Sequence, residues 1–591
     1  MPRDRDKVFS RYEGLLLGPV RSRYPRATRF GPGWKDLYGL SYGGRELDRR
    51  LLAGVDRAGW EAAVLRVRSA VTDAVIDAAV ARLPAELRRQ EGPALAAALR
   101  ARRDALGEAA EWLYRFHAGA PEVHATGRAD AAEVAHHPDG RLTVRISAAG
   151  AGAERAAPWF QRTFVPGETR EVRVYLHGGA DSVWATGEER GRIPVRLVGG
   201  GGDDHFSTAS RSVRLYDHAG RNTVDGPRPA PLDARRYEPP RAPAPLVGEG
   251  WRDWGGWSMP QAWVGYRPEI GVFAGGGRTW YRNGFRAHPW AARTRVRAAF
   301  APGGLRFGAE AEHVRRIPAS PVAVGVFARA SDLEVARFYG FGNDAEAPGR
   351  SSRPTVAQRQ LLLQPTVTLS LGRGAEVAAG PVARWSDTRD ERRSLLAELR
   401  PRGVGSFGEA GGRVEAGWRM RDSAGARGLR LSAGGSAFPA AWDVESGYGE
   451  AHAAARLHWR PALPLRPTLV LRGGGARVWG DFPFHAAAAV GGAETLRGFP
   501  SRRFAGDAAL SGSAELHVKL AEWRWIFPGD VGVLGLADAG RVYLDGRSPG
   551  GWHTAAGGGV WFRPLGSGPL LAATAARGDR TRVYAGLVAD L

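Results

Sequence analysis

The clearest pattern in this chain is an alternation of apolar and polar residues in its second half. Apolar residues at the even positions of 294–300 alternate with Arg293, Arg295 and Arg297, and similar alternation returns over 305–312, 413–421 and 510–520. Because successive side chains of a β-strand point to opposite faces, each stretch predicts a strand with one apolar and one polar face.

The predicted strands are about nine or ten residues long, and no helical pattern separates them from residue 251 onward. Strands of soluble sandwiches usually have about five or six residues, whereas strands that cross a membrane need about 9–11. Aromatic residues near the predicted strand ends suit interfacial girdles, namely Trp280, Tyr281, Trp290, Trp459 and Trp479. Residues 251–591 are therefore predicted to form a transmembrane antiparallel β-barrel rather than a soluble sandwich.

Ahead of the barrel, residues 1–45 show no clear period and are interpreted as irregular, and residues 46–118 are interpreted as a helical segment. Thr72 is an N-cap candidate, and Pro84 should end the helix that follows it. The two predicted apolar faces are Val71, Val75, Ala79 and Leu83, and then Leu95, Leu99, Leu106 and Leu113.

Residues 119–225 favour a small β domain with glycine- and aspartate-rich turns. Similar stretches begin at Val174, Val195 and Val213, 21 and 18 residues apart, and each has an alternating strand before such a turn. This spacing is typical of stacked β-rungs. A β-rung or β-sandwich-like domain is predicted, and the proline-rich residues 226–250 are interpreted as a linker to the barrel.

The turns of this domain raise the question of metal binding. Carboxylates of Asp181, Asp203 and Asp204 on glycine-rich turns would suit calcium. Their spacing does not match the calcium-binding nonapeptide repeat, so turn stabilisation is the preferred interpretation. The histidines near these turns lack metal-binding spacing, and no metal ligand is assigned.

Composition narrows the function classes further. The chain of 591 residues has no cysteine, which excludes disulfides and cysteine-based chemistry. Its net charge of +22 comes almost wholly from arginines scattered along the chain, so no nucleic-acid partner is predicted. The sequence has no recognisable nucleophile–base pair, phosphate-binding loop or metal cluster, so neither an enzymatic activity nor a cofactor is expected.

The signals for membrane entry are incomplete. No apolar run reaches the roughly 18 residues that a membrane helix needs. The first residues also lack the apolar stretch and cleavage site of an export signal. For an outer-membrane barrel we therefore expect the exported polypeptide to start upstream of Met1.

Four segments of the second half resemble, in order, those of a known family. They are Phe338–Asn343, Gly491–Phe499, Ala514–Leu516 and Leu536–Gly540. The second, GGAETLRGF, is similar to the lumenal-loop motif of the bacterial surface-antigen barrels, the superfamily of outer-membrane assembly factors and two-partner secretion transporters. The resemblance covers the C-terminal barrel only and implies about 16 strands.

The resemblance also implies a role for Arg497, Gly498 and Phe499. In this family the loop folds back into the lumen, where its arginine meets acidic wall residues that correspond here to Glu515 and Asp538. The period-two pattern places Glu515 on the polar face. Asp538 shares its parity with two leucines, so a bulge or a packed apolar patch in the lumen is expected there.

The end of the chain resembles the C-terminal signal of outer-membrane barrels. Tyr584, Gly586, Ala589 and Leu591 occupy its positions, although Leu591 replaces the usual phenylalanine. The resemblance implies that the barrel assembly machinery inserts the chain into outer-membrane lipid.

Two functions follow from the resemblance. The first is translocation, insertion or export of polypeptide across the bacterial outer membrane, with a polypeptide substrate or passenger as partner. The alternative is a barrel anchor that forms the C-terminal part of a larger envelope protein with a periplasmic, phosphoesterase-like hydrolase domain. Residues 46–224 resemble the segment that joins such a domain to a barrel, and they lack the βααββ pattern of polypeptide-transport-associated domains.

Overall fold

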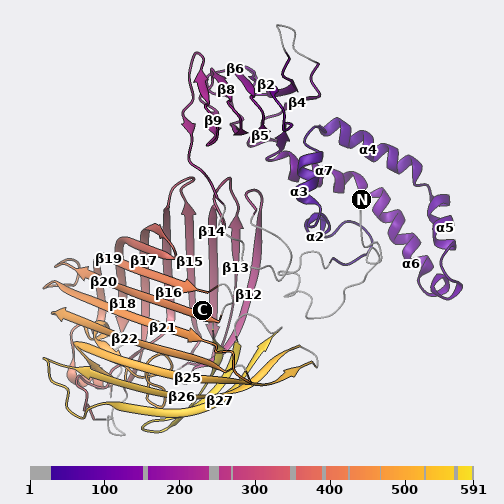
Figure 1. Cartoon of the computed structure of the whole chain (residues 1–591). Helices are drawn as coiled ribbons and strands as arrows, with labels where there is room; N and C mark the ends of the chain where they lie inside the picture. Colours follow the sequence, from indigo (N-terminus) through magenta and orange to yellow (C-terminus); the bar gives the residue numbers. More distant parts are fainter. Residues whose placement is uncertain are drawn as a thin grey trace. The chain divides into compact units, whose positions relative to one another are not determined.

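The computed structural model describes residues 28–150, 157–238, 252–267, 270–346, 354–388, 394–422, 426–465, 467–524, 528–564 and 570–588. The chain divides into two compact units, Met1–Gly255 and Gly256–Leu591, and each is considered by itself (Figure 1). None of the described helices combines the length and the apolar character that spanning a membrane requires.

The first unit begins with helices α2 (Leu37–Ser41), α3 (Arg45–Leu51), α4 (Arg57–Ala70), α5 (Asp73–Ala81), α6 (Ala85–Asp104) and α7 (Leu106–Ala118). The short α2 lies in the stretch that the sequence predicts to be irregular. Thr72 caps α5 as predicted, because its hydroxyl oxygen accepts the Val75 amide hydrogen. Ile76 and Val80 are buried with Ala96, and Val71 and Leu83 of the predicted apolar face pack against this cluster. The prediction is wrong at Val75, which is half exposed. The second predicted helix is divided into α6 and α7, and the break lets α7 pack against α4.

The small β domain consists of β1 (Glu122–His124), β2 (Asp130–His136), β3 (Leu142–Ala148), β4 (Phe160–Phe164), β5 (Val172–Gly178), β6 (Ser182–Gly187), β7 (Val195–Gly201), β8 (His205–Thr208), β9 (Val213–Tyr216), β10 (Thr223–Asp225) and β11 (Leu232–Asp233). Two sheets, β1-β5-β7-β9-β11 and β10-β8-β6-β2-β3-β4, enclose a shared apolar core. All pairs except β2–β3 and β3–β4 are parallel, so the chain winds through stacked rungs, which confirms the predicted fold class.

One of the observed pairings between rungs differs from the pairing that the sequence spacing predicts. Val195 pairs with Val213, the predicted 18-residue step, but its partner on the other side is Val172 rather than Val174. A shift of two residues keeps the same side chains in the core, because the side-chain period of a strand is two. β11 lies within the proline-rich stretch interpreted as a linker, and pairs with β9.

Buried aspartates connect the rungs at one turn. Asp181 Oδ1 accepts the amide hydrogen of Asp130 with an N–O distance of 2.7 Å, and Asp204 Oδ1 accepts that of Asp181 at 3.0 Å. Asp217 is buried beside them, whereas Asp203 is exposed. Across the described residues no group of three or more ligand-type side chains is arranged to hold a metal ion.

We expect Asp181 and Asp204 to make the first unit less stable as the pH rises from 5 to 8. Burial raises the pKa of Asp204 to about 7 and that of Asp181 to about 6. A carboxyl group whose pKa is higher in the folded chain than in the unfolded chain, where it is about 3.9, stabilises the fold while protonated. This stability is fully present below about pH 4 and is lost as the pH rises through both folded-state values.

Pulse proteolysis of the first unit in the full chain measures this change. Between pH 5 and pH 8 the free energy of unfolding should fall by at least about 1 kcal/mol more in the unsubstituted chain than in Asp204→Asn, since one pKa unit corresponds to about 1.4 kcal/mol. The comparison cancels the opposite effect of His117, whose pKa burial lowers to about 4. The asparagine in Asp204→Asn does not titrate, so this variant should lose most of the pH dependence that the two aspartates cause. The same pH dependence in the unsubstituted chain and in Asp204→Asn would contradict the argument.

The second unit is an antiparallel sheet of sixteen strands. They are β12 (Gly256–Arg267), β13 (Gly271–Arg282), β14 (Ala292–Ala301), β15 (Arg306–Arg316), β16 (Val322–Arg337), β17 (Thr355–Gly372), β18 (Ala375–Thr388), β19 (Gly405–Arg421), β20 (Arg427–Phe438), β21 (Tyr448–Trp459), β22 (Thr468–Gly480), β25 (Ala508–Trp523), β26 (Gly529–Tyr543), β27 (His553–Pro564), β28 (Leu570–Arg577) and β29 (Thr581–Val588). Each strand pairs with the next, and β29 comes back into contact with β12, so the sheet curls into a barrel (Figure 1). The predicted sixteen-stranded antiparallel barrel is confirmed.

The period-two pattern sets the two faces of this barrel. Val296 and Phe307 are exposed on the outer face. Arg293 and Arg295 lie on the opposite face, where both contact Glu312, with N–O distances of 2.8 and 3.0 Å. Long connections gather at one end of the barrel, including 338–354, 481–507 and the segment that holds α8 (Leu395–Leu399), whereas the other end carries turns as short as 373–374.

Candidate functional site

The connection between β22 and β25, residues 481–507, packs inside the barrel and is called the lumenal loop here. It contains the 3-10 turn η3 (Phe484–Ala486) and the paired strands β23 (Ala488–Val490) and β24 (Phe504–Gly506). Its buried side chains include Val490, Leu496 and Phe499, and they pack with inward-facing residues of every wall strand from β18 to β27. Contacts with so many strands place the loop in the interior.

Arg497 of the lumenal loop contacts both acidic residues that the sequence singled out. Its Nε and Nη2 donate to the two carboxylate oxygens of Asp538 at 2.8 and 2.6 Å, and its Nη1 donates to Glu515 at 2.6 Å. The three side chains are 8, 1 and 5% exposed, in the order Arg497, Asp538 and Glu515. The planar guanidinium forms a two-pronged contact with Asp538 that lysine could not make.

Asp538 faces the lumen beside a packed apolar patch, and no bulge is needed to turn it inward. Pairing of β26 with β25 is regular from Gly532 to Tyr543, so Leu534, Leu536 and Asp538 all point inward. The two leucines are buried in a cluster with Trp561 and residues of β28. The lumen wall therefore mixes an apolar patch with the acidic site.

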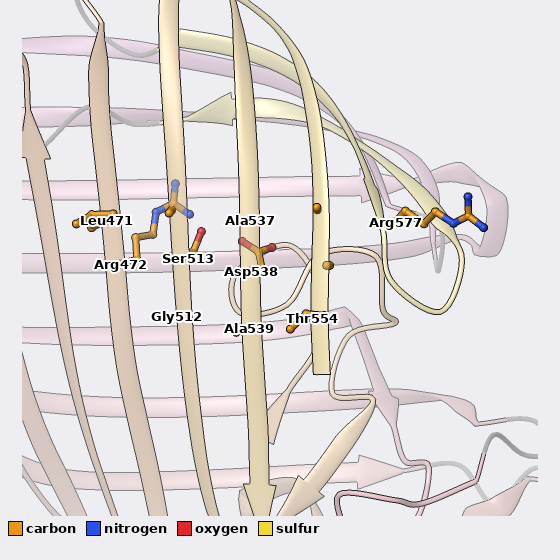
Figure 2. Close-up of a pocket in the computed structure, with 12 residues that line it drawn as sticks. Leu471, Arg472, Gly512, Ser513, Ala537, Asp538, Ala539, Thr554 and Arg577 are labelled. Atoms are coloured by element: carbon orange, nitrogen blue, oxygen red, sulfur yellow. The ribbon is translucent and has the colours of Figure 1, made fainter. Parts of the chain in front are cut away.

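Polar neighbours divide unequally between the two acids. Arg472 Nη2 lies 3.0 Å from Glu515, and His517 Nε2 lies 2.8 Å from it. In contrast, the side-chain hydrogen bonds described for Asp538 all come from Arg497. A hollow of about 790 Å³ adjoins this wall, and Figure 2 shows Arg472, Ser513 and Asp538 on three successive strands beside it.

The next residues of the motif contact the last hairpin of the barrel. Gly498 has φ +85°, and its amide donates to the Tyr584 hydroxyl at 3.1 Å. The Phe499 ring covers Gly578 in the turn between β28 and β29. Gly586, another residue of the predicted C-terminal signal, lies in β29 and pairs with β28. Ala589 and Leu591 lie outside the described residues.

Gly498→Ala should destabilise the loop by about 1–3 kcal/mol, the cost of a strained backbone conformation plus a steric clash. An added Cβ would lie 2.4 Å from the Gly578 backbone nitrogen, in a conformation that side chains rarely adopt. Gly546→Ala is the matched control, because Gly546 has a similar φ of +72° with nothing within 4 Å of an added Cβ. Proteolysis within 491–503 should accelerate more in the first variant, and equal effects would show that the clash is irrelevant.

Asn343 is a structural centre that the sequence did not reveal. Its side chain is buried, its Oδ1 accepts the Val542 amide at 2.9 Å, and its Nδ2 donates to the carbonyl oxygens of Pro549 and Gly551 at 2.7 and 2.8 Å. It therefore ties the β16–β17 connection to the β26–β27 connection. The family resemblance covers Asn343 itself, but no local signal pairs it with a segment some 200 positions later.

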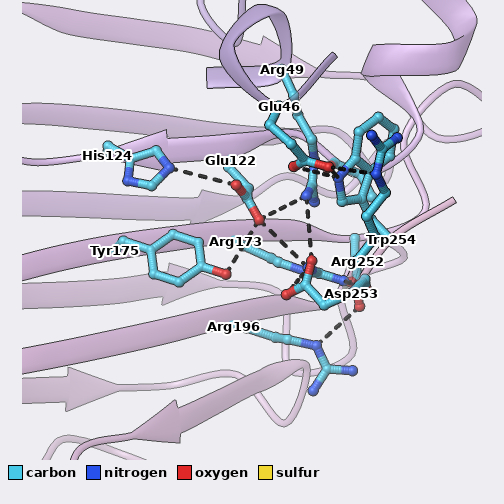
Figure 3. A network of polar contacts seen from close by, with 12 residues as sticks. Glu46, Arg49, Glu122, His124, Arg173, Tyr175, Arg196, Arg252, Asp253 and Trp254 are labelled. Atoms are coloured by element: carbon cyan, nitrogen blue, oxygen red, sulfur yellow. Dashed lines mark hydrogen bonds and ion pairs between the residues drawn. The ribbon is translucent and has the colours of Figure 1, made fainter. Parts of the chain in front are cut away.

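The first unit has its own buried charged cluster (Figure 3). Arg49 Nη1 lies 2.7 Å from Glu122, and Arg173 lies 2.8 Å from Asp253 and 2.6 Å from Glu171. The two arginine side chains are 0 and 2% exposed. Asp253 follows the proline-rich stretch in the sequence and belongs to the first unit, and the barrel strands begin at residue 256. No catalytic arrangement is evident in this cluster, and each charge has an opposite charge beside it.

No protein-family model matches this sequence, and no curated protein is significantly similar to it. Among solved structures the chain is similar to BamA from Haemophilus ducreyi lacking POTRA domains 1–3, with 14% identity over 56% of this chain and 68% of that one, at a TM-score of 0.40. It is also similar to CdiB from Escherichia coli, with 11% identity over 58% and 64% and a TM-score of 0.41. The similarity to CdiB from Acinetobacter baumannii has 12% identity over 55% and 56% and a TM-score of 0.37. The matched part of this chain thus corresponds to between 56% and 68% of the length of these solved chains.

Proposed function

We propose that this chain is an outer-membrane β-barrel protein that translocates, inserts or exports polypeptide, with a lumenal loop locked to the barrel wall by Arg497. The observation that carries the proposal is the buried contact of Arg497 with Glu515 and Asp538. These are the residues on which the sequence resembles the surface-antigen barrels.

The two faces of the barrel support its place in a membrane. Outer-face side chains such as Val264, Val560 and Val583 are 75, 60 and 65% exposed, an apolar surface that water would not favour. Antiparallel pairing of each strand with the next satisfies the backbone of the strands between β12 and β29, as lipid requires. A charged inner face and long loops at one end are typical of outer-membrane barrels.

The position of the lumenal loop indicates how passage through the barrel would be controlled. Because its apolar residues pack against wall strands from β18 to β27, the loop obstructs the interior in this conformation. Passage of polypeptide would require the loop to move, and the Arg497 contact is the bond that opposes this movement. The lock therefore acts as a gate.

The test begins with the location of the full chain. We expect it to fractionate with the outer membrane, and the folded barrel to migrate anomalously on unheated gels. In planar bilayers Arg497→Ala should open more often than the unsubstituted chain. Recovery of a soluble, monodisperse chain without detergent would overturn the membrane assignment, and unchanged conductance in Arg497→Ala would overturn the gate.

A second candidate function is an anchor for a periplasmic hydrolase domain of a larger envelope protein. The observation that favours it is the architecture of the first unit, whose parallel rungs differ from the βααββ modules of polypeptide transporters. A reporter domain fused ahead of the first unit distinguishes the candidates. An anchor should hold the reporter at the membrane, sheltered from external protease, whereas an exporter should deliver it to the cell surface.

A further inference from the structure

Four arginines lie side by side on four successive strands of the barrel, β19 to β22. Arg419 is paired directly with Arg430, Arg430 with Arg456, and Arg456 with Arg472, and this row is called the arginine ladder here. Like charges directly opposite each other disfavour strand pairing, so three such pairs in succession indicate a ligand of opposite charge. We infer that the arginine ladder binds an acidic, extended segment of polypeptide inside the barrel. The inference rests on the proposed function, because it names the chemistry of the polypeptide that the lumen receives.

The arginine ladder faces the lumen. Directly paired residues of an antiparallel sheet share a face, and the row continues from Arg472 through Ser513 to Asp538. Ser513 and Asp538 both contact Arg497 of the lumenal loop, at 2.9 and 2.6 Å. Figure 2 shows Arg472, Ser513 and Asp538 along this row. One end of the ladder therefore lies beside the lock.

The other end of the ladder lies near the short turns of the barrel. The Arg419 amide donates to the Gly374 carbonyl oxygen in the turn 373–374, at 3.0 Å. The side chains of Arg419 and Arg430 are exposed, and that of Arg472 is 28% exposed. On β20, β21 and β22 the lumenal loop packs with apolar residues at the opposite ends of the strands, namely Phe438, Tyr448 and Val478. The ladder therefore runs from the short-turn end of the barrel toward the lock.

The shape of the wall favours an extended chain as the ligand. The next inward-facing residues form a second row in register and are all small, namely Gly417, Ser432, Ala454 and Gly474. This row reaches a carboxylate at Glu376 of β18. Three strand spacings of about 4.8 Å give the ladder a length of about 14 Å, which four or five extended residues would span. Guanidinium groups along a line suit carboxylates along a chain, whereas a phosphate group is best bound by donors that converge on one point.

Binding of synthetic hexapeptides to the full chain in detergent tests this inference. Fluorescence anisotropy should show that hexaglutamate binds, that hexalysine does not, and that added salt weakens the binding. Arg419→Gln and Arg430→Gln should each weaken the binding of hexaglutamate about 2- to 5-fold, the usual effect of one exposed ion pair, and the double variant should weaken it further. Arg427→Gln is the matched control, because Arg427 belongs to the same strand as Arg430 but lies on its opposite, outer face.

The outcomes separate the inference from the proposed function. Weaker binding in the two ladder variants, with unchanged binding in Arg427→Gln, supports the ladder as the site. An equal loss in Arg427→Gln, full binding in the double variant, or tighter binding of inorganic tripolyphosphate than of hexaglutamate would overturn the inference. All variants should keep the anomalous migration of the folded barrel on unheated gels. The proposed function fails by another readout, namely unchanged bilayer conductance in Arg497→Ala, whatever the peptides bind.

Discussion

Arg497→Ala should destabilise the docked position of the lumenal loop by about 3 kcal/mol, because it leaves desolvated carboxylates without their cation. Asp538 is 1% exposed, and its described side-chain bonds all come from Arg497, so most of the cost should arise there. Glu515 keeps Arg472 and His517 as neighbours. The barrel should still form, while proteolysis of 491–503 accelerates and channel opening becomes more frequent.

A second substitution identifies the source of this cost. Asp538→Asn in the Arg497→Ala background removes the uncompensated charge and should restore much of the protease resistance. Glu515→Gln in the same background should restore little, since Arg472 still contacts that position. Arg497→Lys should fall between, because an ammonium keeps the charge but loses the two-pronged contact. Equal rescue by both second substitutions would contradict this division of roles.

Arg173→Met should destabilise the first unit by about 3–5 kcal/mol, the usual effect of breaking a buried ion pair from one side. Arg173 contacts both Glu171 and Asp253 and is almost fully buried. Methionine fills a similar volume without charge, so packing changes little. The loss arises from the carboxylates, of which Glu171 keeps Arg196 at 3.0 Å and Asp253 keeps Arg49 at 3.7 Å. Pulse proteolysis of the first unit in the full chain gives the free energy of unfolding.

Arg211→Met is the matched control for this change. Arg211 pairs with Glu189, and its side chain is 62% exposed. Exposed ion pairs contribute at most about 1 kcal/mol, so this variant should unfold almost like the unsubstituted chain. Similar losses in the two variants would show that burial of the cluster is not what matters.

The sequence determined the features that depend on neighbouring residues. Period-two alternation assigned Val296 and Arg295 to opposite faces, because the pleat of a strand fixes where successive side chains point. The same parity rule placed Glu515 on the inner face. Thr72 was identifiable as a cap, because its hydroxyl needs to reach only three residues ahead. The contact of Arg497 with its two acids was anticipated through the family resemblance and not from the pattern.

Local predictions were wrong or left open where more than one arrangement of the chain fits the same sequence pattern. Val75 and Ile76 are both apolar, and only the position of α6 decided that Ile76 is buried. Val172 and Val174 share one face, so the core accepts either as the partner of Val195, and the path through the intervening turn selected Val172. For Asp538 the sequence left a bulge and a packed apolar patch open, and the regular pairing of β26 with β25 decided for the patch.

The tertiary structure alone decided which distant segments meet. Asn343 bonds a segment near residue 550, and Tyr584 bonds the loop at Gly498, although neither pairing leaves a mark in the local sequence. Such contacts depend on the curvature of the whole sheet and on the path of a loop through its interior. Local residue preferences act over a few positions, whereas these distances are set by how the sixteen-stranded sheet curls around the loop.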